Sequence, residues 1–365
     1  MQVKYVDLGA QWGDIKQRAL PEIDRVLSTG MYLEHDVVSR LEGRLADFLG
    51  VKNVVCLNSG TDALLMSLMS LGLRPGDEVI TVPNTYIASV AAIEHVGARA
   101  VFVDVGEDHL IDTSKIEEAI TSKTRAIMPV HLEGKIANLT KIREIADSYG
   151  LRIVEDSAQA IGSHLNGITP GQISDIACFS MHPLKNLNGA GDGGFIATNS
   201  DELASRISRL RSHGQSSRNK SLEFGFVSRL DSIQAAILHI KLDDLPLVID
   251  KRRQIARKYD SAFGITPIKI PLSAPEVFHT YHLYVIEIDN RDKVQFELSE
   301  KGIETKIHYP TLITDQIAFT NKYSNASLKI DNAREQVGRI LSIPIHQNLS
   351  QSQISYVIET LGNAL

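Results

Sequence analysis

The alternation of short apolar runs with helical patterns between residues 53 and 199 most limits what this chain can fold into. β-Branched runs predict strands, and the segments between them have the length and apolar spacing of helices. Such alternation is typical of a mostly parallel sheet that helices cover on both faces, so we predict an α/β fold. The predicted strands are 53–57, 78–82, 99–103, 125–128, 152–155 and 194–198, and the predicted helices between them are 61–71, 86–95, 114–120 and 139–149.

The chain of 365 residues is too long for one ordinary core, and the order of its elements changes after residue 267. There a strand, a helix, a short strand and later helices predict a smaller α+β domain. We place the boundary at Leu245-Pro246, which gives a large domain, 1–245, and a small domain, 246–365. The predicted elements around and after the boundary are helices 201–211, 231–242 and 248–263, strand 282–288, helix 293–301 and strand 304–308.

The charge of the chain argues against a nucleic-acid partner. The net charge is −6 and the pI is near 6.1, whereas binding to a phosphate backbone needs a clustered excess of Lys and Arg. The basic run Lys251-Arg252-Arg253 fits the solvated face of an amphipathic helix, and we assign it no function. Cys56 and Cys178 both occupy predicted buried strand positions, which favours core packing.

Neither a membrane span nor a secretion signal is expected. No apolar window approaches the length that a bilayer requires, and the first ten residues lack a basic region followed by an apolar stretch. We therefore predict a cytoplasmic protein without a membrane partner.

In an open parallel sheet, ligands bind beyond the carboxyl ends of the strands, so the polar residues there are candidates for function. The first strand runs through 58–62 directly into a helix, which directs N–H groups, a hydroxyl and a positive helix dipole at one point. This predicts a phosphate site, although Ser59, Thr61 or Asp62 could equally cap the helix. Tyr86 follows the second strand and could stack on a flat ligand or pack into the core.

The fifth predicted strand ends in acids that cannot act as a pair. Neighbouring strand residues point to opposite faces, so Glu155 and Asp156 do not face each other. A single acid at a strand end, with the amide of Gln159 three residues on, suits a cationic ring nitrogen and a neighbouring phenolic oxygen. A structural carboxylate bound to backbone N–H groups is the alternative.

Lys185 lies in the glycine-rich loop 179–194. Gly189, Gly191 and Gly194 satisfy the pattern G-x-G-x-x-G, but that motif must follow a strand and open a helix, whereas this one precedes a strand. We therefore reject nicotinamide binding. The histidines lack metal-ligand spacing, and no G-x-S-x-G motif indicates a hydrolase, so no metal is expected. The candidate residues that remain form a phosphate site, an aromatic ring, an acid, an amide and a lysine. Together these are the groups that binding of pyridoxal phosphate (PLP) requires.

These motifs make the chain similar, over nearly its whole length, to the sugar aminotransferases of the DegT/DnrJ/EryC1/StrS family. The resemblance rests on residues 59–64, 155–160, 179–194, 228–230, 234–236 and 308–310. It implies fold type I of the PLP-dependent transferases, the aspartate aminotransferase superfamily. In that fold a three-layer α/β/α large domain with a mostly parallel sheet joins a smaller C-terminal α+β domain. The family resemblance further implies a homodimer with active sites at the interface.

The resemblance also implies roles for individual residues. Lys185 would be the catalytic residue, as Schiff-base partner of the cofactor and as acid and base. Asp156 would keep the pyridine nitrogen protonated, Gln159 would bind the 3′ oxygen, and Tyr86 would stack on the ring. The implied phosphate contacts are Gly60, Thr61 and Ser180, and the implied substrate contacts are Tyr32, Arg229, His308 and Tyr309.

The implied reaction is transfer of an amino group, with L-glutamate as donor, to a 3- or 4-keto sugar carried on a nucleotide, in amino-sugar and polysaccharide biosynthesis. Lys185 favours this reaction, since family members with histidine at that position act as dehydratases. A PLP-dependent sugar dehydratase and a non-catalytic PLP-binding regulator are the alternatives on the same fold.

The chain departs from the family pattern at several positions. Val227 stands where the family usually has an asparagine that reaches the partner subunit's cofactor phosphate, a contact that Ser228 could replace. Glu133, residues 34–35 and residues 311–314 also depart from the pattern. Because these segments are expected to approach the sugar nucleotide, they bear on the identity of the substrate more than on the reaction.

Overall fold

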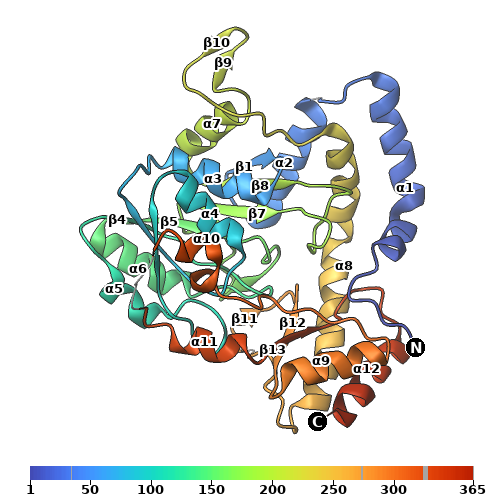
Figure 1. Cartoon of the computed structure of the whole chain (residues 1–365). Coiled ribbons are helices and arrows are strands. Elements are labelled where there is room, and N and C mark those ends of the chain that lie inside the picture. The colour runs from blue at the N-terminus through green and yellow to red at the C-terminus, as the bar shows by residue number, and fades with distance from the viewer. Residues whose placement is uncertain (34, 273, 324–327, 365) are drawn as a thin grey trace.

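The computed structural model describes residues 1–33, 35–272, 274–323 and 328–364, and a seven-stranded sheet lies at its centre (Figure 1). The strand order is β1-β8-β7-β5-β4-β2-β3. β8 runs antiparallel to both of its neighbours, and the other ladders are parallel, which confirms a mostly parallel sheet. The strands are β1 (Asn53–Leu57), β2 (Glu78–Thr81), β3 (Arg99–Phe102), β4 (Thr124–Ile127), β5 (Arg152–Asp156), β7 (Ile176–Ser180) and β8 (Gly194–Thr198).

Helices cover both faces of this sheet because its side chains alternate between two apolar cores. Val55 and Leu57 of β1 belong to one core, which α3 (Gly60–Ser70) and α7 (Asp201–Leu210) complete. Val54 and Cys56 belong to the other, which α2 (His35–Leu49) and the first half of α8 (Ser232–Phe263) complete. The result is the expected three-layer α/β/α arrangement. Cys56 and Cys178 are free and buried, as predicted.

The predicted elements of the sheet region are confirmed almost to the residue. All six predicted strands end within one residue of the observed ends. Local signals explain this accuracy: the Ser59 side chain accepts a hydrogen bond from the N–H of Asp62 and caps α3, and Gly150 ends α6 at a positive φ of 64°. The helices between these strands are α4 (Ile87–His95), the 3-10 helix η1 (Thr113–Lys115), α5 (Ile116–Ala119) and α6 (Leu139–Tyr149).

The two helices predicted at 231–242 and 248–263 are one continuous helix, α8, with Pro246 in its interior. Proline removes one backbone hydrogen bond, but here the apolar contacts on either side of it outweigh that loss. Leu245 and Ile249 pack in the second core, and Tyr259 packs in a third. The proposed domain boundary at residue 245 therefore falls within a helix, and the division into two domains stays a proposal.

The second half of α8 packs with the C-terminal elements around the third core. Val3 also belongs to this core, since the N-terminal segment bridges to Ile303. The strand predicted at 304–308 is wrong: only Lys306 bridges to Ser342, because the N–H of Glu304 donates to Val3 instead. The C-terminal elements around this core are β12 (Tyr284–Glu287), α9 (Arg291–Glu300), β13 (Ile340–Ile343) and α12 (Gln351–Asn363). In contrast, η2 (Ile313–Asp315), α10 (Ile317–Thr320) and α11 (Asp331–Val337) pack in the first core.

The remaining elements lie outside the main layers. Helix α1 (Leu8–Thr29) packs along α8, and a small hairpin projects from the body at the top of Figure 1. That hairpin consists of β9 (Gln215–Ser217) and β10 (Lys220–Ser221), and a second short pair joins β6 (His164–Leu165) to β11 (Val277–Phe278). Over the described ranges, every helix is too short or too polar to cross a membrane.

Candidate active site

A cavity of about 430 Å³ opens at the carboxyl ends of the strands. The residues that follow β1, β2 and β4 line it, together with the last residues of β5 and β7. The segment 308–310 contributes His308 and Tyr309 from the C-terminal part of the chain. This is the edge at which parallel strands end, where ligands of α/β proteins bind.

The structure brings together all but two of the site residues that the sequence predicts. Tyr32 is exposed in the turn before α2, away from the cavity wall. Arg229 lines a neighbouring surface hollow with Asp62 and Asp231. The predicted residues that line the cavity are Gly60, Thr61, Tyr86, Asp156, Gln159, Ser180, Lys185, His308 and Tyr309.

The N-terminus of α3 meets the end of β7 at one side of the cavity. A Cβ on Gly60 would lie 2.8 Å from the Cβ of Ser180, so only glycine permits this close approach. Ser59, rather than Thr61, supplies the helix cap. The N–H groups of the first turn and the hydroxyls of Thr61 and Ser180 therefore lie where an anion would find donors and a positive dipole.

Asp156 reaches the cavity from the end of β5 and is only 6% exposed. One carboxylate oxygen accepts a hydrogen bond from the Ser89 hydroxyl at 2.6 Å, and the other accepts the N–H of Ala158 at 3.2 Å. Glu155 lies on the opposite face of the strand, where its carboxylate is 2.6 Å from the His131 ring. The prediction that these two acids do not form a pair is confirmed.

Lys185 lines the same cavity from a turn in which its N–H donates to the carbonyl of His182. Burial lowers the pKa of Lys185 to about 8, while the Asp156 carboxylate acts in the opposite direction. A larger fraction of this amine is therefore unprotonated near neutral pH than of an exposed lysine. Such an amine can attack an aldehyde.

Gln159 is held by contacts at both ends of its amide. Its oxygen accepts the backbone N–H of Glu133 at 2.6 Å, and its nitrogen donates to the Tyr309 hydroxyl at 3.2 Å. The Tyr309 ring lies 5.5 Å from the ring of Tyr86. Tyr86 is 57% exposed at the cavity, so the alternative that it packs into the core is wrong.

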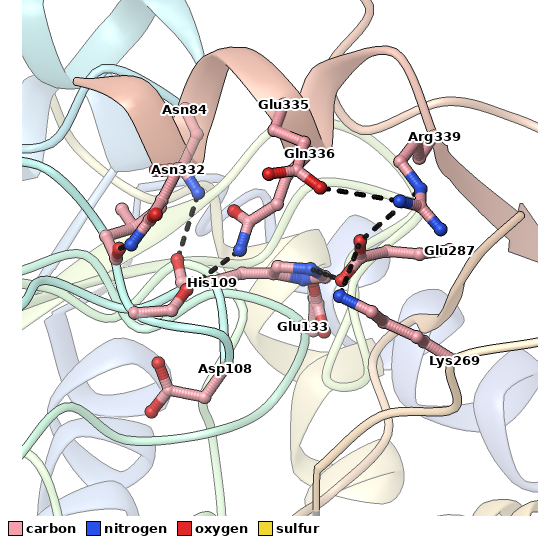
Figure 2. Close-up of polar contacts among 12 residues, drawn as sticks. Asn84, Asp108, His109, Glu133, Lys269, Glu287, Asn332, Glu335, Gln336 and Arg339 are labelled. Carbon is pink, nitrogen blue, oxygen red and sulfur yellow. Dashed lines mark hydrogen bonds and ion pairs between the residues drawn. The ribbon is translucent and has the colours of Figure 1, made fainter. Parts of the chain in front are cut away.

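A buried ionic network surrounds His109 (Figure 2). The backbone N–H of Glu133 connects this network to Gln159. The Glu133 carboxylate is 2.6 Å from Nδ1 of His109 and 2.9 Å from the Lys135 ammonium. Nε2 of His109 lies 3.4 Å from Glu287. Burial alone would lower the pKa of His109, but the two carboxylates outweigh burial and raise it to about 9. The Glu133 side chain therefore points into this network, not toward the cavity as its segment was expected to do.

The structure corrects the prediction for the basic run 251–253. Lys251 is exposed, but Arg252 is only 3% exposed and lines the cavity. The helical spacing of apolar residues indicates this burial, because Arg252 lies three residues after Ile249 and four before Ala256, on the buried stripe of α8. Sequence reasoning also missed other lining residues, among them Tyr5, His282 and His346.

The other residues that depart from the family pattern differ in their burial and in their contacts. Val227 is 54% exposed, while the hydroxyl of Ser228 is buried and donates to Asn58 at 3.0 Å. Ser228 is therefore not available to replace the missing asparagine. Residues 312 and 313 pack in the first core instead of approaching the cavity. Glu34 lies outside the described residues.

The cavity fits PLP. The phosphate would occupy the N-terminus of α3, Asp156 would face the ring nitrogen, and the Lys185 amine is available for the aldehyde. The fold and this set of residues define a PLP-dependent transferase of fold type I. The sequence model of the DegT/DnrJ/EryC1/StrS aminotransferase family matches residues 13–362, so the chain belongs to that family.

Similar proteins agree with this assignment. The chain is 38% identical over 363 residues to the UDP-2-acetamido-2-deoxy-3-oxo-D-glucuronate aminotransferase of Pseudomonas aeruginosa, covering 99% of this chain and 100% of the relative. The structure of S. venezuelae DesV in complex with a ketimine intermediate matches with a TM-score of 0.96 and 37% identity, over 99% of this chain and 98% of that one. NtdA from Bacillus subtilis with bound cofactor PMP gives a TM-score of 0.93 and 31% identity, over 100% and 85%.

Proposed function

We propose that this protein is a PLP-dependent aminotransferase that moves an amino group from L-glutamate to a 3- or 4-keto sugar carried on a nucleotide. The observation that carries the proposal is that Lys185, Asp156 and the N-terminus of α3 line one cavity. Two relatives that are 38% and 37% identical are named as a UDP-2-acetamido-2-deoxy-3-oxo-D-glucuronate aminotransferase and a dTDP-3-amino-3,4,6-trideoxy-alpha-D-glucose transaminase. We assign the reaction to amino-sugar and polysaccharide biosynthesis in the cytoplasm.

The family resemblance implies each proposed role, and the position of the side chain in the cavity supports it. The bound cofactor supplies an electron sink for the carbanion that forms at the reacting carbon. Asp156 keeps the ring nitrogen protonated, and Gln159 binds the 3′ oxygen. Lys185 holds the cofactor and then moves a proton to and from the reacting carbon, for which a pKa of about 8 is suitable. Gly60, Thr61 and Ser180 hold the phosphate.

We propose that two chains complete the substrate site. His308 and Tyr309 line the cavity and would contact the sugar, whereas Tyr32 and Arg229 lie outside it in a single chain. A homodimer would bring them to the partner's cavity. Phe224 is fully exposed on the same segment as Arg229, as an interface residue would be before assembly.

The first half-reaction tests this function directly. Purified PLP-loaded protein is mixed with L-glutamate and no sugar, and 2-oxoglutarate is measured. One equivalent per bound cofactor is expected, with none from Lys185→Ala and an unchanged yield from the control Lys141→Ala on the exposed face of α6. Conversion of a keto sugar without any amino donor would support the dehydratase. Absence of both activities in a PLP-loaded protein would support the regulator.

A further inference from the structure

Arg252 is a buried cation that the described residues leave without an acidic partner. One terminal nitrogen, Nη1, donates to the backbone carbonyls of Tyr281 at 3.1 Å and His282 at 3.2 Å. The other, Nη2, lies 3.5 Å from the side-chain oxygen of Gln347, at the limit of a hydrogen bond. Nε has no hydrogen-bond partner among the described residues. The edge formed by Nε and Nη2, which can pair with a carboxylate in bidentate fashion, therefore makes only the long contact to Gln347 within the described part of the chain.

The groups around Arg252 do not neutralise its charge. Its positive charge lowers the pKa of His282 and of His346, after the larger effect of their burial. Burial also lowers the pKa of Arg252 itself, to about 10, so the side chain stays charged at neutral pH. An unpaired charge in the interior is costly unless an anion approaches it. Neutral backbone carbonyls satisfy hydrogen bonds but provide no opposite charge.

The part of the cavity wall around Arg252 contains further polar atoms that lack hydrogen-bond partners among the described residues. Nδ1 of His282 and Nδ1 of His346 are buried and lack hydrogen-bond partners in the part of the chain that the structure describes. Both residues line the main cavity with Arg252 and Tyr5. Four distant parts of the sequence thus form one polar wall. The described residues do not satisfy all of the hydrogen-bonding groups of this wall.

This wall adjoins the reacting centre. His282, Arg252 and Lys185 line the same cavity, and the charges of Lys185 and Arg252 both lower the pKa of His282, after the larger effect of its burial. The donor amino acid must place its α-carbon beside Lys185, and its carboxylates lie one and three bonds from that carbon. A carboxylate of the donor can therefore reach the wall when the donor is in position to react.

We propose that Arg252, with Tyr5, His282 and His346, forms a carboxylate subsite that binds the amino donor. The proposal rests on the proposed aminotransferase function and adds the group that selects an amino acid as donor. A carboxylate on the sugar could use the same chemistry, and the experiment below separates the two sources.

Glutarate, a dicarboxylate without an amine, is the probe. Its affinity for the PLP-loaded protein is measured by calorimetry in the wild type, in Arg252→Gln and in Arg252→Lys. The control is Arg253→Gln, whose side chain donates to the carbonyl of His279 and does not line the cavity. We expect Arg252→Gln to weaken glutarate binding roughly tenfold or more. Arg252→Lys should retain part of the affinity, and Arg253→Gln all of it, with PLP affinity unchanged throughout.

A structural role for Arg252 predicts the opposite pattern. If Arg252 only ties α8 to residues 281 and 282, a folded, PLP-loaded Arg252→Gln protein will bind glutarate as the wild type does, and the proposal is overturned. Should Arg252→Gln fail to fold, Arg252→Lys and Tyr5→Phe replace it. Unchanged glutarate affinity in both would equally overturn the subsite.

Kinetic measurements distinguish a carboxylate of the amino donor from a carboxylate of the sugar. In the single-turnover reaction with L-glutamate alone, Arg252→Lys should raise the apparent Kd for glutamate at least several-fold with a smaller effect on the limiting rate constant. The affinity for a keto sugar without a carboxylate should stay the same. If only a carboxylate-bearing sugar binds less well, the donor assignment is overturned. Arg252-dependent glutarate binding without amino transfer would contradict the proposed function but not the subsite. Amino transfer with unaltered glutarate binding in the variant would contradict the subsite alone.

Discussion

The backbone N–H of Glu133 donates to the side-chain oxygen of Gln159 across 2.6 Å. Glu133 has a φ of +66°, which is an uncommon conformation for a residue with a side chain. Its carboxylate is held by His109 and Lys135, and its carbonyl accepts the His279 ring at 2.9 Å. The ionic network therefore keeps in place the N–H that orients the cavity amide.

Replacing Glu133 with glutamine should destabilise the protein strongly. Glutamine keeps the size of the side chain but removes the negative charge, so the buried His109 and Lys135 cations lose their counterion. We expect a loss of roughly 3–5 kcal/mol in the free energy of unfolding, measured by urea denaturation. Glu144→Gln, which breaks an exposed ion pair with Lys141, should cost about 0–1 kcal/mol. Equal costs would show that the network contributes no more than a surface pair.

The stability of the protein should fall at alkaline pH through His109. The pKa of about 9 in the folded protein lies above the ordinary histidine value of 6.5, so the stabilisation is complete below pH 6.5 and is lost as pH rises through 9. The shift corresponds to at most about 3 kcal/mol. Urea denaturation across this range should show a decline in wild type that is smaller in His109→Gln. Parallel curves for the two proteins would mean that His109 does not titrate as expected.

Capture of PLP by the protein without cofactor should depend on the pH through Lys185. Because the unprotonated amine reacts, the rate should rise with pH and level off above a midpoint near the pKa of about 8. Since the Asp156 charge raises the pKa of Lys185, Asp156→Asn should move the midpoint to lower pH. Stopped-flow absorbance measures both rates. A rate that continues to rise up to pH 10.5, the ordinary pKa of lysine, would contradict the lowered pKa of Lys185.

Restoring the family asparagine at residue 227 should tighten cofactor binding. Val227 is half exposed, so Val227→Asn disturbs no core, and the family resemblance implies that the new amide reaches the partner's cofactor phosphate. One added hydrogen bond to a charged group corresponds to roughly 1.5–3 kcal/mol, or about a tenfold to hundredfold lower Kd for PLP. Titration of the cofactor-free protein gives this Kd, and Val227→Ala is the control. An identical Kd in both variants would mean that the amide makes no such contact.

The sequence by itself predicted six of the seven strands of the sheet, all but β7, and most of the cavity. The periodicity of strands and helices is a local signal, and so are turn residues such as Gly150. The elements that such signals predict therefore form without depending on distant contacts. Parallel strands end at one edge of a sheet, and this rule predicted that Gly60 and Asp156 lie at the same edge, while the glycine-rich loop singled out Lys185.

Only the tertiary structure decided the continuity of α8 at Pro246, the burial of Arg252 and the pairing of Glu133 with His109. Local rules predict a break at proline, a solvated basic run and an acid near the substrate. Each outcome depends instead on contacts between segments far apart in the chain: the second carboxylate of the network, Glu287, lies 178 residues from His109. Burial changes the energy of a charge by several kcal/mol, and packing against distant segments determines which charges are buried and which partner they find.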